Sequence, residues 1–100
     1  MNKRVIYVAK MKYGTPCLIR LQVTGETEKQ FQRDYEDEAV PLVGSEVYFG
    51  RRVSKKGLNW FDTLDAAATE LYALTLKRKR SLMDCIEQID DYLSLIEDFR

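Results

Sequence analysis

The feature of this sequence that most limits its fold is the C-terminal stretch of residues 64–99, which contains no glycine and no proline. Apolar residues recur in it at alternating spacings of four and three, which is the repeat of a coiled-coil seam. At about 1.5 Å per residue, one helix of this length runs roughly 54 Å, far beyond the side of a small sheet. We therefore predict a homodimer or higher oligomer that buries this stripe between copies. The seam consists of Leu82, Ile86, Ile89, Leu93 and Ile96.

A basic run at residues 77–80 interrupts the apolar repeat and leaves two arrangements open. In one, a single helix continues through the run. In the other, the run ends a first helix and Ser81 caps a second, with Asp84 in the place of the usual glutamate of a capping box, which makes a helical hairpin. We favour the continuous helix, because four strong helix formers without glycine are a poor stop signal. Its start is predicted at Asp62 or Thr63, either of which can cap a helix.

The N-terminal half predicts an antiparallel hairpin. In residues 4–13, alternate positions from Val5 to Tyr13 are apolar, with Lys10 and Lys12 on the other side. Residues 17–24 alternate more cleanly, and the intervening residues 14–16 have turn chemistry. We expect the two strands to pair with each other.

Further strands are expected after this hairpin. A weaker one spans residues 28–35, with Phe31 and Tyr35 toward the core, and a loop follows because residues 36–38 are all acidic and Pro41 lacks a backbone donor. Residues 46–53 and 58–61 are predicted to form a second hairpin with residues 54–57 at its basic tip.

These elements predict one α+β domain: an antiparallel sheet of four to five strands over residues 1–61, followed by a helical region over residues 62–100. With 100 residues, 45% of them hydrophobic, the chain can bury a single core. Sixteen basic and sixteen acidic residues balance, which argues against a histone-like protein. The apolar stretches are too short for a membrane span and the start does not resemble a signal peptide, so we expect a cytoplasmic protein without membrane partners.

The types of side chain present argue against catalysis. Histidine is absent, and Cys17 and Cys85 stand far apart, so neither a zinc site nor a Cys-His nucleophile pair is expected. Both cysteines lie among apolar positions, which predicts reduced, buried thiols rather than a disulfide. The sequence also has no glycine-rich phosphate loop and no metal-ligand cluster. We therefore expect no enzymatic activity, no catalytic residues, no metal and no cofactor.

The predicted second hairpin carries the most informative candidate site. Cationic side chains there can bind phosphate while a neighbouring aromatic face stacks on a base, which suits RNA, single-stranded DNA or a nucleotide. Alternatively, the lysines solvate a turn and the tryptophan anchors the helix to the sheet. The candidate ligand-binding residues are Arg51, Arg52, Lys55, Lys56 and Trp60.

Residues 59–67, which read Asn-Trp-Phe-Asp-Thr-Leu-Asp-Ala-Ala, together with the order of strands and helix, resemble small phage or mobile-element accessory proteins. Many of these look like a few antiparallel strands followed by an aromatic-Asp-Thr helix entry and a long coiled-coil helix. The resemblance implies a non-enzymatic protein that binds a component of host defence or transcription, and it transfers no site residue.

Two functions follow as hypotheses. The first is a homo-oligomeric binding protein that inhibits or sequesters a host protein or a nucleotide signal. The second is a nucleic-acid-binding regulator that uses the basic hairpin at residues 51–60. Zero net charge and blocks of alternating sign, such as +4 in residues 77–80, favour the first.

Overall fold

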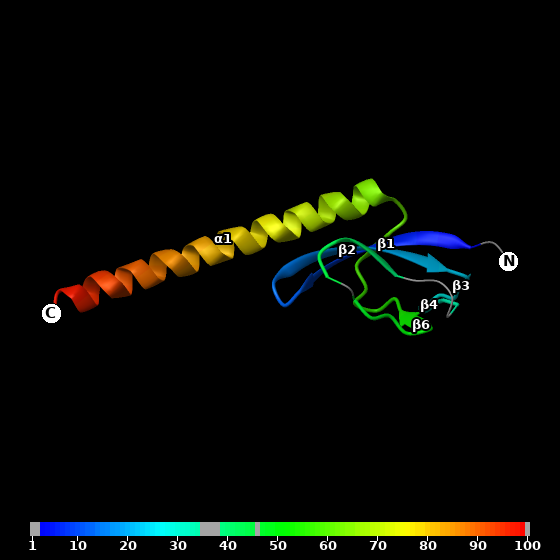
Figure 1. Cartoon of the computed structure of the whole chain (residues 1–100), viewed down its shortest axis with the longest axis horizontal. Helices are drawn as coiled ribbons and strands as arrows, with labels where there is room; N and C mark the ends of the chain where they lie inside the picture. Colours follow the sequence, from blue (N-terminus) through cyan, green and yellow to red (C-terminus); the bar gives the residue numbers. More distant parts are fainter. Residues whose placement is uncertain (1–2, 35–38, 46, 100) are drawn as a thin grey trace.

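The computed structural model describes residues 3–34, 39–45 and 47–99, and it has an α+β layout of small antiparallel sheets followed by one long helix (Figure 1). One sheet has the strand order β5-β2-β1-β7, and the other has the order β3-β4-β6. The elements are β1 (Arg4–Lys12), β2 (Thr15–Val23), β3 (Gly25–Glu26), β4 (Gln30–Gln32), β5 (Val40–Val43), β6 (Arg52–Ser54), β7 (Trp60–Phe61) and α1 (Leu64–Glu97).

The β1–β2 hairpin forms as the sequence predicts. Its register runs without interruption from Arg4 opposite Val23 to Lys12 opposite Thr15. The two connecting residues, Tyr13 and Gly14, have φ values of 50° and 81°. Two consecutive positive φ values match a tight turn whose twist suits the flanking strands, and glycine adopts this geometry without strain.

Both faces of this hairpin are covered. On one face Ile6 and Val8 lie opposite Leu21 and Ile19 and pack around Phe31, which is fully buried. The other face packs against α1 through a smaller cluster that contains Ala9, Leu18, Ala67 and Leu71. The alternation predicted that only one side of β1 is apolar, whereas both sides of this strand are buried. A strand that is covered on both faces is apolar almost continuously.

The second predicted hairpin is wrong. Strand β6 pairs with β4, while β7 pairs with β1 in the other sheet, and residues 47–50 form no strand. The reason is that the free edge of β1 accepts β7, where Trp60 and Phe61 pack on opposite faces of the sheet. Phe31 lies in the core as expected, whereas Tyr35 and the acidic residues 36–38 lie outside the described residues.

Pro41, predicted in a loop, lies in β5 and pairs opposite Ile19 of β2. Because β5 is an edge strand, its outer side has no neighbour that needs a proline N–H, which is where sheets tolerate proline. Gly44, directly after β5, has a φ of 80°, and a Cβ there would collide with the Pro16 carbonyl and lie 2.9 Å from Cys17 Sγ.

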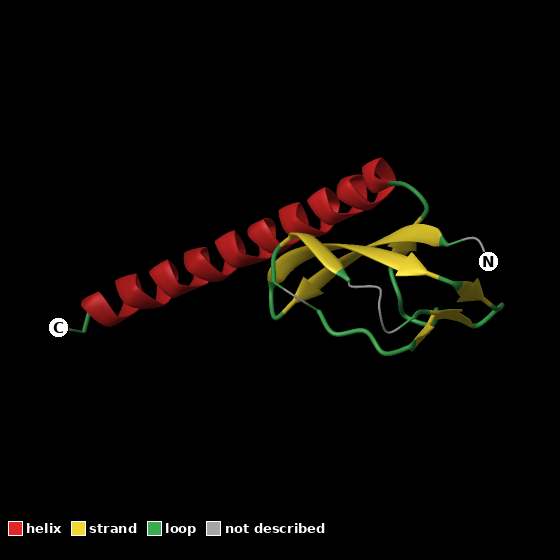
Figure 2. Ribbon diagram, turned by 45° about the vertical axis from the view of Figure 1, so that its right-hand side comes forward, coloured by secondary structure: helices red, strands yellow, loops and turns green. Residues whose placement is uncertain are grey.

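Helix α1 is continuous, so the helical-hairpin alternative is excluded. Thr63 is the N-cap, and its hydroxyl accepts a hydrogen bond from the Ala66 N–H. The first turns pack on the sheet through Ala67 and Leu71, whereas every residue from 77 to 99 is exposed. The chain consequently extends 70 × 23 × 23 Å, with the C-terminal half of α1 projecting past the sheets (Figure 2).

We expect Gly44→Ala to destabilise the protein more than Gly57→Ala. Both positions have positive φ, which costs an L-residue about 1–2 kcal/mol. A Cβ at Gly57 meets open space, while one at Gly44 must displace β2, which adds about 1–3 kcal/mol. Urea unfolding of both variants measures the difference, and equal midpoints would contradict the packing described for β5.

Candidate functional site

The projecting half of α1 carries the five predicted seam residues in an exposed state. Their exposed fractions lie between 47% for Leu82 and 57% for Ile86 and Ile96. Further large apolar side chains of the same segment are also exposed, namely Met83, Tyr92, Leu95 and Phe99. The projecting segment therefore exposes many large apolar side chains, among them the whole predicted seam.

Charge is divided along this projecting segment. Residues 77–80 are all basic, whereas residues 81–99 hold six acidic residues and no basic one. Arg78 lies beside the β1–β2 turn, with its guanidinium 3.2 Å from where a Cβ of Gly14 would stand. The helix therefore leaves the sheet near its basic run. Beyond that point it carries acidic side chains and the exposed apolar seam.

Trp60 belongs to an aromatic cluster at the joint between the two sheets. Its ring meets Phe31 edge-on, with centroids 4.9 Å apart and an interplanar angle of 85°. The Lys55 ammonium lies 4.7 Å from the Phe31 ring and 5.7 Å from the Trp60 ring, and the Arg4 guanidinium lies 5.4 Å from Trp60. Such cation–π contacts hold the cations against the rings.

The same cations form an ion-pair network. Arg4 pairs with Glu26 and Asp62, and Lys55 Nζ lies 3.1 Å from the second carboxylate oxygen of Glu26. The hydrogen bond to Asp62 raises the pKa of Arg4 above its ordinary value, and attraction to Glu26 adds to it. Single exposed pairs stabilise a fold by about 0–1 kcal/mol, but this network joins β1, β3, the turn after β6 and the start of the helix.

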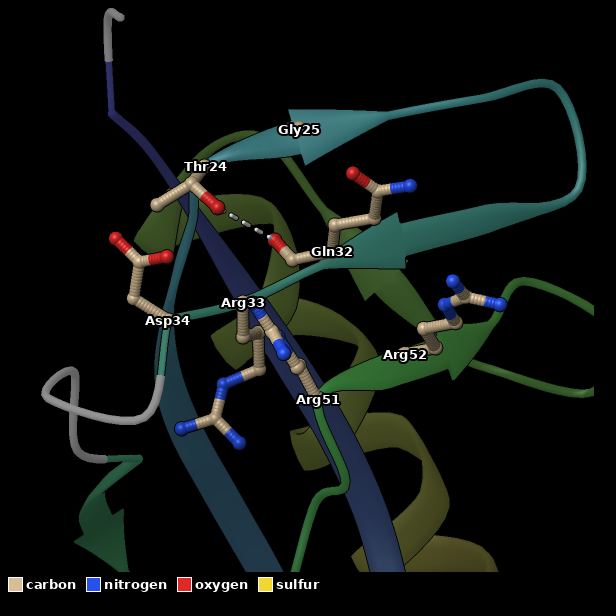
Figure 3. Close-up of a pocket in the computed structure, with 7 residues that line it drawn as sticks. All are labelled: Thr24, Gly25, Gln32, Arg33, Asp34, Arg51 and Arg52. Atoms are coloured by element: carbon tan, nitrogen blue, oxygen red, sulfur yellow. Dashed lines mark hydrogen bonds between the residues drawn. The ribbon is translucent and has the colours of Figure 1, made fainter.

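Arg51 and Arg52 lie at a separate hollow of about 480 Å³ (Figure 3). The hollow is open to solvent on one side of the second sheet. Arg33, only 8% exposed, also lines it and donates from a guanidinium nitrogen to the Phe49 carbonyl at 2.8 Å. The remaining lining residues are Thr24, Gly25, Gln32 and Asp34. The hollow is therefore lined by three arginines and by one carboxylate, that of Asp34.

The structure thus separates the five candidate ligand residues. Arg51 and Arg52 meet at the hollow, and Lys55 and Trp60 meet at the aromatic cluster. Lys56 is exposed in the turn, where its backbone N–H donates to Ser54 Oγ. Arg33 was missed, although its spacing of two from Phe31 places it on the buried side of the same segment.

The cysteine prediction is half correct. Both thiols are free and Cys17 is buried, but Cys85 is exposed on the projecting part of α1. Helical spacing placed it near the apolar stripe, and the stripe itself has no cover in a single chain. Within the described ranges, no group of three metal-ligating side chains gathers, and no helix is both long and apolar enough to cross a membrane.

Comparisons with known protein families, with curated proteins and with solved structures gave no match for this chain.

We expect Trp60→Ala to lower stability by about 3 kcal/mol, because it removes a large ring from the core beside Phe31. Trp60→Phe is expected to be milder, since an aromatic ring remains to meet Phe31 and the two cations. Tyr48→Ala, which truncates an aromatic residue that is 93% exposed, is the control and should leave the melting temperature unchanged. Calorimetry of the three variants tests this, and an unchanged Trp60→Ala would argue against the anchoring role.

Proposed function

We propose that this protein is a non-enzymatic binding protein that works as a homo-oligomer joined through the projecting half of α1. The observation that carries the proposal is the exposed apolar seam from Leu82 to Ile96, on a helix that has already left its own sheet. Burying one leucine or isoleucine side chain contributes about 1.5–3 kcal/mol, and each copy supplies five in the seam.

Oligomerisation also accounts for the length of the helix. Helical segments without tertiary packing are marginal in water even when their residues favour helix, because nucleation is costly. Residues 77–99 are all exposed, and they contain no glycine or proline. Pairing with a second copy supplies the apolar contacts that such a segment needs, and the outward acidic residues keep the assembled rod solvated.

The arginine hollow is the proposed ligand site of this assembly. Arg51 and Arg52 line it together with the buried Arg33, and the guanidinium group matches phosphate in geometry and charge. We propose that it binds a phosphate-bearing molecule in the cytoplasm, so that the oligomer sequesters a nucleotide signal. A host protein as target, inhibited by the same assembly, is the alternative that the resemblance to phage accessory proteins supports.

A nucleic-acid regulator is the second candidate. The three arginines favour it, because phosphate contacts supply most of the affinity of nucleic-acid binding. Base stacking on Trp60 is a weaker part of that hypothesis, since Arg4 and Lys55 already lie against this ring.

We expect Ile89→Asp to abolish oligomerisation, because an unpaired carboxylate at the centre of the seam is costly to bury, by several kcal/mol. Ser94→Asp is the matched control: it adds the same charge to the same helix, away from the seam positions. Light scattering of the wild type should give more than one chain per particle, with Ser94→Asp unchanged. A wild type that stays monomeric at tens of micromolar would contradict the proposal.

We expect Arg52→Ala to weaken binding of a fluorescent nucleotide and of labelled single-stranded RNA, while Lys56→Ala has little effect. Both variants lose one exposed positive charge from neighbouring positions, but of the two residues Arg52 alone lines the hollow. Fluorescence anisotropy at several salt concentrations measures this. If the hollow binds phosphate, the salt slope falls by about one unit in Arg52→Ala. Equal losses in both variants would point to a diffuse basic surface instead.

A further inference from the structure

We infer that two copies of this chain pair antiparallel along residues 77–98 of α1, so that their sheets stand at opposite ends of a rod. This inference rests on the proposed self-association and adds its orientation. Three observations carry it: the division of charge along the projecting helix, the place of Lys79 in the apolar repeat, and the point at which the helix leaves the sheet.

The first observation is the division of charge. The basic run at residues 77–80 lies near the sheet, and the six acidic residues all lie farther out. In an antiparallel pair, the basic run of each copy lies opposite residues 95–98 of the other, which include Glu97 and Asp98. In a parallel pair, basic run meets basic run, and Glu97 and Asp98 meet the same residues of the other copy, so like charges repel at both ends of the contact. The central acidic residues 84–91 lie near each other in either orientation, so the ends of the contact decide between them.

The second observation concerns the repeat itself. Extending the four-three spacing back from Leu82 by three residues reaches Lys79, which therefore occupies a seam position. In a parallel pair in register, Lys79 meets the same lysine of the other copy. In the antiparallel pair Lys79 lies opposite Ile96, over which its aliphatic stem can lie, with its ammonium directed to the neighbouring Glu97.

Apart from the layers that contain Lys79, all seam layers of the antiparallel register are apolar. It places Leu82 opposite Leu93 and Ile86 opposite Ile89 of the second copy, and the twofold symmetry repeats each contact. The centre of the pair then lies between residues 87 and 88. All five exposed seam side chains of each copy are used, and none is left facing solvent.

The third observation is where the sheet ends. Arg78 lies beside Gly14 in the β1–β2 turn. From about this level outward, the helix is exposed on all sides and a second helix can pack against it. The antiparallel register brings Phe99 of the second copy to the level of Leu76, next to that turn. Tyr13 stands there with 98% of its surface exposed, and Phe99 is 85% exposed, so each offers the other an aromatic partner.

Small-angle scattering of the wild-type protein tests the orientation. One chain is 70 Å long. Two chains that overlap along 22 helical residues, or about 33 Å, give a particle of about 110 Å. A parallel pair, with both sheets at one end, stays near the 70 Å length of a single chain. We expect the longer particle at twice the chain mass of 11.7 kDa.

Disulfide trapping provides the second test, in a Cys85→Ser background that leaves the buried Cys17 in place. Leu82→Cys and Leu93→Cys are prepared separately, one of them labelled with ¹⁵N, and are oxidised alone and after mixing. In the antiparallel pair, residue 82 lies opposite residue 93, while the two copies of residue 82 stand about 16 Å apart along the axis. A disulfide requires Cα atoms within about 4.4–6.8 Å. We therefore expect mixed dimers, which intact mass spectrometry identifies, and none from either variant alone.

The two experiments distinguish a wrong orientation from a failure of self-association. Monomers in scattering, with no cross-links in any sample, would overturn the self-association itself. A dimer near 70 Å in length, with each cysteine variant cross-linking to itself, would overturn the antiparallel orientation and leave self-association intact. Circular dichroism of each variant at the working concentration confirms that the helix is retained before cross-linking is scored.

Discussion

The β1–β2 hairpin is the layer on which the rest of the molecule depends, because it is covered on both faces. One face holds the main core around Phe31, and the other carries the first turns of α1. The hairpin is also the centre of the larger sheet, with β5 on one edge and β7 on the other. A change in its register by one residue would exchange the two faces and separate both layers from their partners.

The second constraint is a mismatch of length between sheet and helix. The sheet covers only the first turns of α1, and the apolar repeat continues well beyond that cover. A small domain cannot bury this excess within itself, because its sheet strands are at most nine residues long. The unburied seam, the acidic outer segment and the basic run at its base are the three parts of the association surface that we propose.

The arginine hollow and the aromatic cluster illustrate how tertiary structure separates neighbours in sequence. Trp60 turns inward to Phe31, and Lys55 is drawn to Glu26 and the rings. Arg51 and Arg52, only a few residues earlier, line the hollow instead. The separation arises because β6 joins the second sheet whereas β7 returns to β1. Any phosphate-binding function thus rests on the arginines and not on the tryptophan.

The sequence by itself predicted the local elements: the first hairpin, a helix cap at Asp62 or Thr63, and a helix with an apolar repeat for which the continuous form was favoured over a helical hairpin. Their signals are periodicity, capping chemistry and the absence of glycine and proline, all of which act between residues close in the chain. Tertiary structure alone decided the partners of β6 and β7 and the edge position of Pro41. These depend on which free sheet edge or core space is available after the hairpin forms, and contacts between distant residues leave no periodic signal in the sequence.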